Sequence, residues 1–263
     1  MGADRFVRAP GGSLFVRVWG TIGSSTGRSA IILFHDSLGC VELWRDFPSQ
    51  LASATGLPVV AYDRLGFGRS DPHPGRLKFG FVDDEARTAV PELRSALGIE
   101  RMVLFGHSVG GGMAVASAAA FRGESLALVT ESAQAFVEDR TIAGIREGRR
   151  MFSAPDQMAR LARYHGDKAR WVVDAWTETW LAPQFATWNL DHDLRSLQCP
   201  VLAIHGDRDE YGSSRHPERI CALPATPTQS LILADCGHVP HREKPDQVLG
   251  AVRQFLAPSI PRC

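Results

Sequence analysis

The sequence predicts an α/β fold with a mostly parallel central sheet and helices on both faces. Short apolar runs typical of buried parallel strands alternate with helical stretches along most of the chain. Residues 135–198 interrupt this alternation, because they carry no strand signal and several helical ones. We therefore expect one core, residues 1–134 and 199–263, with residues 135–198 inserted as a helical cap before the strand at 201–205.

The expected strands are short apolar runs at residues 14–19, 30–34, 58–62, 102–105, 127–130, 201–205 and 231–233. Core helices are expected at residues 44–54, 82–97, 109–121 and 245–256, the last with proline in its first turn. Cap helices are expected at residues 140–152, 155–164, 168–180 and 185–197.

Composition and charge argue against several classes of protein. The 29 Lys and Arg residues balance 29 Asp and Glu residues, so no global field favours nucleic acid or an anionic membrane. The chain shows neither a signal-peptide core nor a run of about 18 apolar residues. We expect a cytoplasmic protein, monomeric or homodimeric, that acts on a small molecule. Scattered cysteines without Cys-x-x-Cys spacing suit reduced thiols: Cys40, Cys199, Cys221, Cys236 and Cys263.

The strongest local signal is Gly106-His107-Ser108-Val109-Gly110, which lies between an expected strand and an expected helix. A serine in such a sharp turn takes a strained backbone conformation, and small neighbours let strand and helix approach each other. Its hydroxyl then projects at the positive end of the helix. The alternatives are an ordinary glycine-rich turn or a nucleotide loop, but the spacing of a dinucleotide or phosphate loop is absent. Ser108 is the expected nucleophile.

A serine nucleophile needs a base that a carboxylate orients, and candidates for both follow later strands. The strand at 201–205 leads into Gly206-Asp207-Arg208-Asp209-Glu210, and the strand at 231–233 leads into Asp235-Cys236-Gly237-His238. Catalytic groups gather at such carboxyl ends of parallel strands. Nucleophile, acid and histidine thus occur in the chain order that suits a nucleophile-elbow fold.

Over nearly its whole length the chain resembles a capped serine hydrolase of the α/β-hydrolase superfamily. The motifs that carry the resemblance are the elbow, Phe34-His35-Asp36-Ser37-Leu38-Gly39, Asp63-Arg64-Leu65-Gly66-Phe67-Gly68-Arg69-Ser70, Gly206-x-x-Asp209, and Gly237-His238 before Glu243-x-Pro245. This similarity implies that Asp209 is the catalytic acid and His238 the base. Other candidates for the acid are Asp207, Glu210 and Glu131, and His241 is expected to line or support the site.

The resemblance also implies an oxyanion hole formed by the main-chain N–H groups of Val109 and Ser37. The chain departs from the family's pattern beside Ser37, where the common His-Gly becomes His35-Asp36. Asp tolerates left-handed backbone angles better than most residues, so we expect the loop to keep its shape. A carboxylate near the hole would nevertheless weaken the stabilisation of an anion.

The cap is expected to roof an apolar substrate pocket. Aromatic stripes are most often core, but Trp176 and Trp180 share one helical face and would point into such a pocket. His107 is also expected to pack beneath the elbow. The expected substrate contacts are His107, Phe136, Met151, Trp176, Trp180, Trp188 and Val239.

Two other features have simpler explanations. Asp191-His192-Asp193 looks like a metal site, but three adjacent residues cannot all face one ion, so we expect a solvated turn and neither metal nor cofactor. The first half of the cap is basic, either as a solvated face or to attract an anionic substrate. The basic residues are Arg140, Arg146, Arg149, Arg150, Arg160, Arg163, Lys168 and Arg170.

The predicted function is a serine hydrolase that cleaves a small ester, thioester or lactone through an acyl-enzyme. Other chemistries use the same triad, so a carbon–carbon bond hydrolase, a perhydrolase or an acyltransferase is an alternative. A ligand-binding signal regulator with slow turnover is another. Dehalogenases and epoxide hydrolases of this superfamily have Asp at the elbow, and Ser108 argues against them.

Overall fold

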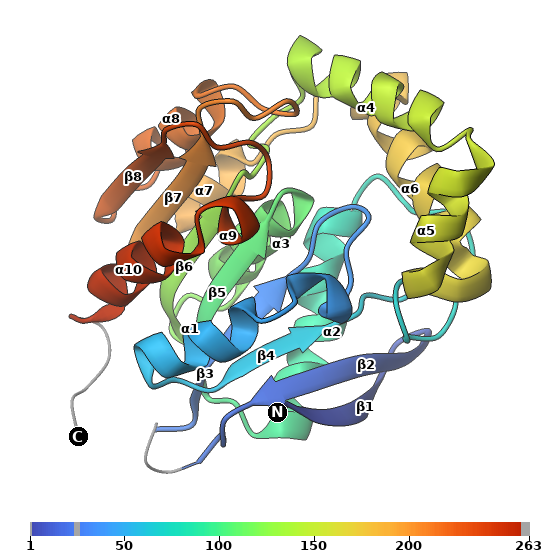
Figure 1. Cartoon of the computed structure of the whole chain (residues 1–263). Coiled ribbons are helices and arrows are strands. Elements are labelled where there is room, and N and C mark those ends of the chain that lie inside the picture. Colours follow the sequence, from blue (N-terminus) through green and yellow to red (C-terminus); the bar gives the residue numbers. More distant parts are fainter. Residues whose placement is uncertain (1, 24–26, 259–263) are drawn as a thin grey trace.

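The computed structural model describes residues 2–23 and 27–258, which contain an eight-stranded sheet in the order β1-β2-β4-β3-β5-β6-β7-β8 (Figure 1). β2 pairs antiparallel with β1 and with β4, and all the other neighbouring strands are parallel. The predicted, mostly parallel sheet is therefore confirmed. The strands are β1 (Ala3–Ala9), β2 (Gly12–Trp19), β3 (Ser29–Phe34), β4 (Val59–Tyr62), β5 (Arg101–His107), β6 (Ser125–Glu131), β7 (Val201–Gly206) and β8 (Thr228–Leu233).

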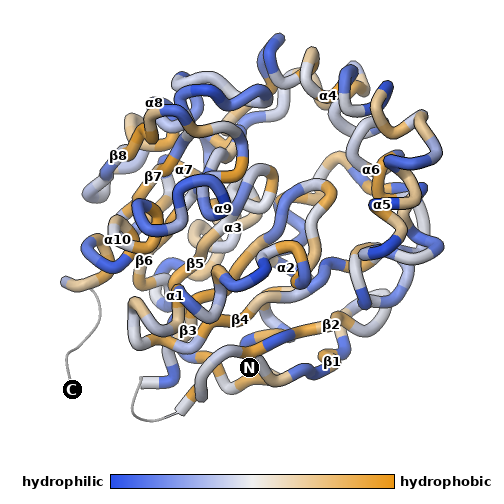
Figure 2. The backbone as a smooth tube through the Cα atoms, viewed as in Figure 1, coloured by the Kyte–Doolittle hydropathy of each residue, from blue (hydrophilic) through white to orange (hydrophobic). Residues whose placement is uncertain are grey.

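Helices cover both faces of this sheet because its strands are apolar on both sides (Figures 1 and 2). In β3, Ile31 and Leu33 pack toward α1 and α10, whereas Ile32 and Phe34 pack toward α2 and α3. Buried residues of α7 and α8 join the second of these two cores. The core helices are α1 (Phe47–Thr55), α2 (Phe81–Leu97), α3 (Val109–Ala120), α8 (Arg215–Ala222), α9 (Pro240–Glu243) and α10 (Pro245–Leu256).

The chain between β6 and β7 is helical, as expected for residues 135–198. Phe136, near the start of this segment, forms an isolated antiparallel bridge with Asn189, which precedes α7. α6 packs against both α4 and α5, and these three helices stand apart from the sheet at the right of Figure 1, whereas α7 packs on α3. We call α4, α5 and α6 the roof helices. The segment contains α4 (Asp139–Met151), α5 (Pro155–His165), α6 (Ala169–Trp180) and α7 (Asp191–Ser196), with 3-10 turns at Gly166–Lys168 and Pro183–Phe185.

Several elements differ from the prediction. The strand β1 was not expected because it lies at the sheet edge with mostly exposed side chains and has no apolar run. The helix expected from residue 44 begins at Phe47, since Arg45 has a φ of 53° that ends a 3-10 turn at Val41–Trp44. The helix expected at 185–197 is reduced to the six residues of α7. The short helices α8 and α9 were also not expected.

Every helix in residues 2–23 and 27–258 is too short or too polar to cross a membrane. Cys40, Cys199, Cys221 and Cys236 are free thiols, as expected, and Cys263 lies outside the described residues.

The junction between β5 and α3 is crowded by main-chain atoms. A Cβ added at Gly106 would lie 2.1 Å from the carbonyl oxygen of Gly110, and a Cβ added at Gly110 would lie 2.2 Å from the carbonyl oxygen of Phe34. Such contacts cannot be relieved by rotating a side chain. The close approach of β3, β5 and α3 therefore requires glycine at both positions.

We expect Gly106→Ala to lower the free energy of unfolding by about 3 kcal/mol, because the backbone must move to admit the methyl group. Urea denaturation followed by tryptophan fluorescence measures the change. Gly123→Ala is the control, since no atom lies within 4 Å of the Cβ that it would add. Equal stability of the two variants would contradict the crowding.

Candidate active site

Ser108 lies in a strained turn between β5 and α3, with φ 55° and ψ −128°. Its N–H donates to the carbonyl of Glu131 at 2.8 Å, and its own carbonyl accepts the N–H of Gly111 at 2.8 Å. A non-glycine residue keeps such a conformation only where its surroundings enforce it. These hydrogen bonds direct the side chain of Ser108 into a cavity.

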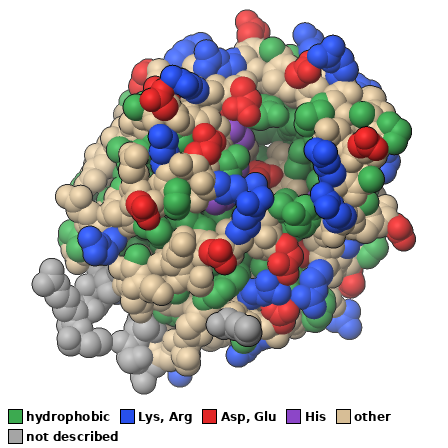
Figure 3. Space-filling view, in the orientation of Figure 1, with side chains coloured by type: hydrophobic (Ala, Val, Ile, Leu, Met, Phe, Trp, Pro, Cys, Tyr) green, Lys and Arg blue, Asp and Glu red, His purple; other side chains and the backbone are tan. Residues whose placement is uncertain are grey.

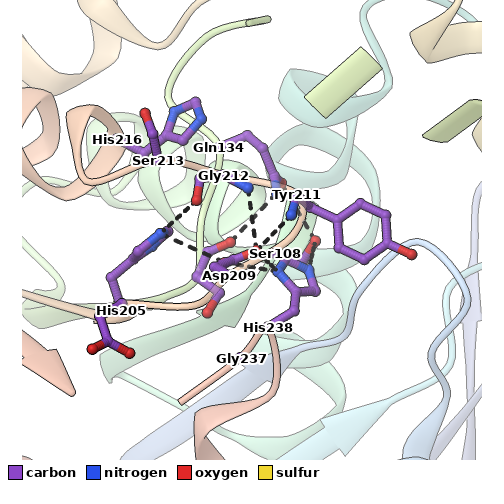
Figure 4. Close-up of polar contacts among 12 residues, drawn as sticks. Ser108, Gln134, His205, Asp209, Tyr211, Gly212, Ser213, His216, Gly237 and His238 are labelled. Carbon is purple, nitrogen blue, oxygen red and sulfur yellow. Dashed lines mark hydrogen bonds and ion pairs between the residues drawn. The ribbon is translucent and has the colours of Figure 1, made fainter. Parts of the chain in front are cut away.

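His238 lies between Ser108 and Asp209 (Figure 4). Its Nε2 is 3.0 Å from Ser108 Oγ, and its Nδ1 is 2.9 Å from each carboxylate oxygen of Asp209. Ser108 follows β5, Asp209 follows β7 and His238 follows β8, so the carboxyl ends of these strands bring the three residues together. Such a chain of hydrogen bonds can transfer the serine proton to the imidazole.

Asp209 is buried and oriented by several donors. Its Oδ1 accepts the N–H groups of Tyr211 at 2.7 Å and Gly212 at 3.2 Å, in addition to the hydrogen bond with His238. Burial opposes ionisation of this carboxyl, but His238 and the other nearby donors outweigh it, so the pKa of Asp209 lies below its ordinary value. Asp209 is thus an oriented carboxylate.

The other candidate acids do not contact His238. Glu131 accepts a 2.5 Å hydrogen bond from Nδ1 of His241, and both side chains are buried. Asp207 accepts the N–H of Cys236, and Glu210 is exposed. His241 supports the site from below the elbow rather than lining the cavity.

Two neighbours of the triad were not singled out from the sequence. The Oε1 of Gln134 lies 3.3 Å from Ser108 Oγ and accepts from it, so Gln134 competes with His238 for the serine proton. The ring of Tyr211 lies 4.7 Å from that of His238, measured between centroids. Neither residue belongs to a local motif. Their positions depend on the pairing of β5 with β6 and on the loop after β7.

Val109 and Ser37 lie beside the nucleophile. Val109 begins α3, so its N–H has no partner in the helix, and Ser37 lines the cavity together with Ser108. A void of about 10 Å³ lies against both Val109 and Ser37. The two residues therefore lie against the same small space.

Asp36 does not adopt the left-handed backbone conformation that the sequence analysis considered. Among the described residues other than glycine, positive φ angles occur at Arg28, Arg45, Ser108, Ser132 and Asp235. The Asp36 carboxylate instead stabilises its own loop, since Oδ1 accepts the N–H of Leu38 at 2.7 Å. The loop therefore keeps its shape through a side-chain hydrogen bond.

The Asp36 carboxylate also forms an ion pair beneath the elbow. Its Oδ2 lies 3.3 Å from Nδ1 of His107, whose Nε2 lies 2.7 Å from the carbonyl oxygen of His238. Both ring nitrogens of His107 thus face acceptors, as in an imidazolium. Burial disfavours the charged imidazolium, but the interaction with Asp36 outweighs burial and raises the pKa of His107. Burial likewise disfavours the charged carboxylate, but His107 outweighs it and lowers the pKa of Asp36. The anion beside Ser37 is therefore compensated.

We expect Asp36→Asn to lower the free energy of unfolding by about 3 kcal/mol near pH 5.5, because it leaves the buried His107 charge unpaired. His107 gains its proton in the folded state at a pKa above its ordinary value of 6.5, so the contribution of the pair is complete below 6.5 and is lost as the pH rises through the raised pKa. Urea denaturation of both proteins at about pH 5.5 and about pH 10 measures the difference. An effect that does not shrink at the higher pH would contradict the ion pair.

Ser108 and His238 open into a cavity of about 310 Å³ between the core and the roof helices, visible as a hollow in Figure 3. Of the expected substrate contacts, His107, Trp176, Trp180 and Val239 line it. Other apolar lining residues are Leu38, Leu43, Ile145, Phe152 and Leu161. The cavity is suited to a small ligand with an apolar part.

The other three expected contacts lie outside this cavity. Phe136 packs on His216 at a centroid distance of 4.5 Å, on the side of α8. Met151 is 43% exposed at the end of α4, and its neighbour Phe152 faces the cavity instead. Trp188 packs on Trp180, because the turn before α7 replaces the expected helix and places this ring outside the cavity lining.

The Asp191-His192-Asp193 sequence begins α7 rather than forming a solvated turn. Asp191 accepts two hydrogen bonds from Arg219, each of 2.6 Å, so it forms an ion pair with α8. Within the described parts of the chain, the one grouping of three potential metal ligands is His107, Glu131 and His241. These side chains already pair with one another or with Asp36.

Comparison with known proteins agrees with this geometry. Residues 31–251 match the model of the alpha/beta hydrolase family. The chain belongs to this family. This alpha/beta hydrolase is 31% identical over 203 residues to serine hydrolase BPHL of Homo sapiens, a match that covers 74% of this chain and 68% of that protein. Family, relative and site together make the chain a hydrolytic enzyme.

Solved structures share the fold of this alpha/beta hydrolase. A bacterial membrane phospholipase A has a TM-score of 0.79 at 21% identity, and the match covers 98% of this chain and 86% of that one. The enol-lactonase from Burkholderia xenovorans LB400 has a TM-score of 0.72 at 20% identity, with 96% and 99% covered. At these identities the likeness concerns the fold.

Proposed function

We propose that the chain is a serine hydrolase that cleaves a small ester, thioester or lactone through an acyl-enzyme on Ser108. The observation that carries this proposal is the 3.0 Å contact between Ser108 Oγ and His238 Nε2, with Nδ1 held at 2.9 Å from Asp209. The apolar cavity of about 310 Å³ beside Ser108 limits the substrate to a small molecule.

In the proposed mechanism, His238 Nε2 takes the proton of Ser108 as Oγ bonds to the carbonyl carbon. The C=O π electrons move onto oxygen, and the N–H groups of Val109 and Ser37 stabilise the resulting oxyanion. The protonated His238 then gives its proton to the leaving group as that bond breaks. Water repeats the sequence on the acyl-enzyme, releases the acid and restores Ser108.

The same proposal assigns residues 135–198 as a cap and the cytoplasm as the location. The cap assignment is supported by the roof helices, which supply Ile145, Phe152, Leu161, Trp176 and Trp180 to the cavity wall. The location is supported by the free thiols of the described residues. We propose a small molecule as the enzyme's ligand, with no nucleic acid or membrane as a partner.

We expect a fluorophosphonate probe to form an adduct on Ser108, located by mass spectrometry of tryptic peptides. Ser108→Ala should abolish the adduct, and His238→Ala should slow its formation by at least about a thousandfold, because the serine then lacks its base. Cys40→Ala is the control, since this buried thiol has a pKa raised to about 12 by burial and is not expected to react. An unlabelled but folded wild-type protein would overturn the proposal and favour a ligand-binding regulator.

We also expect Trp176→Ala to raise KM for 4-nitrophenyl esters of apolar acids by about tenfold, because Trp176 lines the cavity and its removal leaves the acyl chain less buried. Steady-state kinetics with butanoate and octanoate esters measures the effect. Trp188→Ala is the matched control, because this ring packs on Trp180 outside the cavity lining. A KM that is unchanged by Trp176→Ala for every ester would contradict the assignment of the cavity.

A further inference from the structure

The wall of the cavity carries two arginines at its exposed end. Arg160 on α5 and Arg242 on α9 both line the cavity and both are exposed to solvent. In Figure 1, α9 lies near the centre against the core and α5 lies at the right among the roof helices, and Lys and Arg side chains flank the hollow in the space-filling view (Figure 3). Both side chains are therefore accessible to solvent and to a ligand in the cavity.

Neither guanidinium forms an ion pair with a carboxylate, although the charge of Asp36 acts on Arg242 at longer range. Within the described residues, no hydrogen bond or ion pair involves the guanidinium of Arg160, and that of Arg242 donates only to the main-chain carbonyl of Leu43. Some other arginines of the roof helices are paired, as Arg150 is with Glu147 and Arg170 with Asp174, and these paired arginines do not line the cavity. The charges of Arg160 and Arg242 are therefore available to a ligand.

Of the basic residues that the sequence places between positions 140 and 170, Arg160 is the one that lines the cavity. Arg140 donates to the carbonyl of Asp209, and Lys168 donates to the carbonyls of Gly68 and Ser70, so both have structural roles. The basic character of the segment is thus mostly structural or solvated, and Arg160 alone adds charge to the cavity.

Asp36 is the acidic residue among the described lining residues, and its charge is offset. Its carboxylate faces Nδ1 of His107 at 3.3 Å and the N–H of Leu38 at 2.7 Å, beneath the nucleophile. The lining therefore combines an ion pair beside Ser108, an apolar wall and two exposed cations that form no ion pair. A neutral apolar substrate would leave those two cations unused.

On the basis of the proposed hydrolase function, we propose that the enzyme prefers esters or lactones that bear a carboxylate at the end remote from the scissile bond. Arg160 and Arg242 bind this carboxylate, while the apolar wall formed by Phe152, Leu161 and Trp176 holds the carbon chain. The anion stays at the exposed end, where water solvates it further, and the carbonyl reaches Ser108. The two arginines are specificity-determining residues.

The test compares matched substrates that differ in one charge. One pair is mono(4-nitrophenyl) adipate and its methyl ester, which differ in charge on the acyl side. The other pair is 4-carboxyphenyl butanoate and its methyl ester, which differ on the leaving-group side. We expect kcat/KM to be at least about tenfold higher for the anion in one of the pairs, and this preference to decline as salt approaches about 1 M, where charges are screened beyond about 3 Å.

Variants locate the preference. Arg160→Gln and Arg242→Gln should each lower the ratio of anionic to neutral kcat/KM by about threefold or more, the double variant should abolish the preference, and Arg160→Lys should retain part of it. Arg163→Gln is the matched control, because Arg163 lies on the same helix and does not line the cavity. It should leave the ratio unchanged.

The outcomes separate this inference from the proposed function. Ser108-dependent hydrolysis of the neutral esters without any preference for the anions would overturn the inference and leave the hydrolase proposal intact. A preference that Arg163→Gln reduces as much as Arg160→Gln would also overturn it, since the effect would then reflect general surface charge. Failure to hydrolyse any of the four esters would overturn both.

Discussion

The close approach of β3, β5 and α3 at Gly106 and Gly110 is the constraint on which the site depends. It forces Ser108 into its strained turn, and the turn is then connected to the loop that carries His238. Glu131 accepts the N–H of Ser108 and pairs with His241, while His107 Nε2 contacts the carbonyl of His238. The nucleophile and the base are thereby linked through two buried contacts, which maintain the 3.0 Å distance between their reacting atoms.

Charge is arranged along the cavity in a way that suits this chemistry. Asp36 stands where the resemblance to the family implies glycine, and by itself its carboxylate would oppose the oxyanion of the proposed mechanism. The ion pair with His107 offsets the negative charge of Asp36, because the imidazolium lies 3.3 Å from the carboxylate. The charges without an ion-pair partner lie instead at the exposed end, on Arg160 and Arg242. The Asp36 carboxylate, paired with His107, therefore adds no net negative charge beside Ser108.

Features that depend on residues close together in the sequence could be predicted, and features that depend on contacts between distant residues could not. The sheet and the elbow could be predicted because apolar runs and the glycines around Ser108 act locally. Residues of the cavity wall could be predicted only in part: Trp176 and Trp180 line the cavity as expected, but a helix turns by about 100° per residue, and a shift of one position exchanged Met151 for Phe152. Gln134 reaches Ser108 through pairing between strands, and no local pattern reports such a contact.

The roof helices are connected to the catalytic loops at both ends. At the start of α4, Arg140 donates to the carbonyl of Asp209 and Thr141 donates to the carbonyl of Tyr211. At the end of α5, His165 Nε2 lies 2.9 Å from the carbonyl oxygen of Leu38, in the loop that carries Ser37. Moving the roof as one rigid body would break these hydrogen bonds and disturb both the acid and the oxyanion loop. Any movement of the roof that preserves the catalytic geometry is therefore confined to the part between these hydrogen bonds.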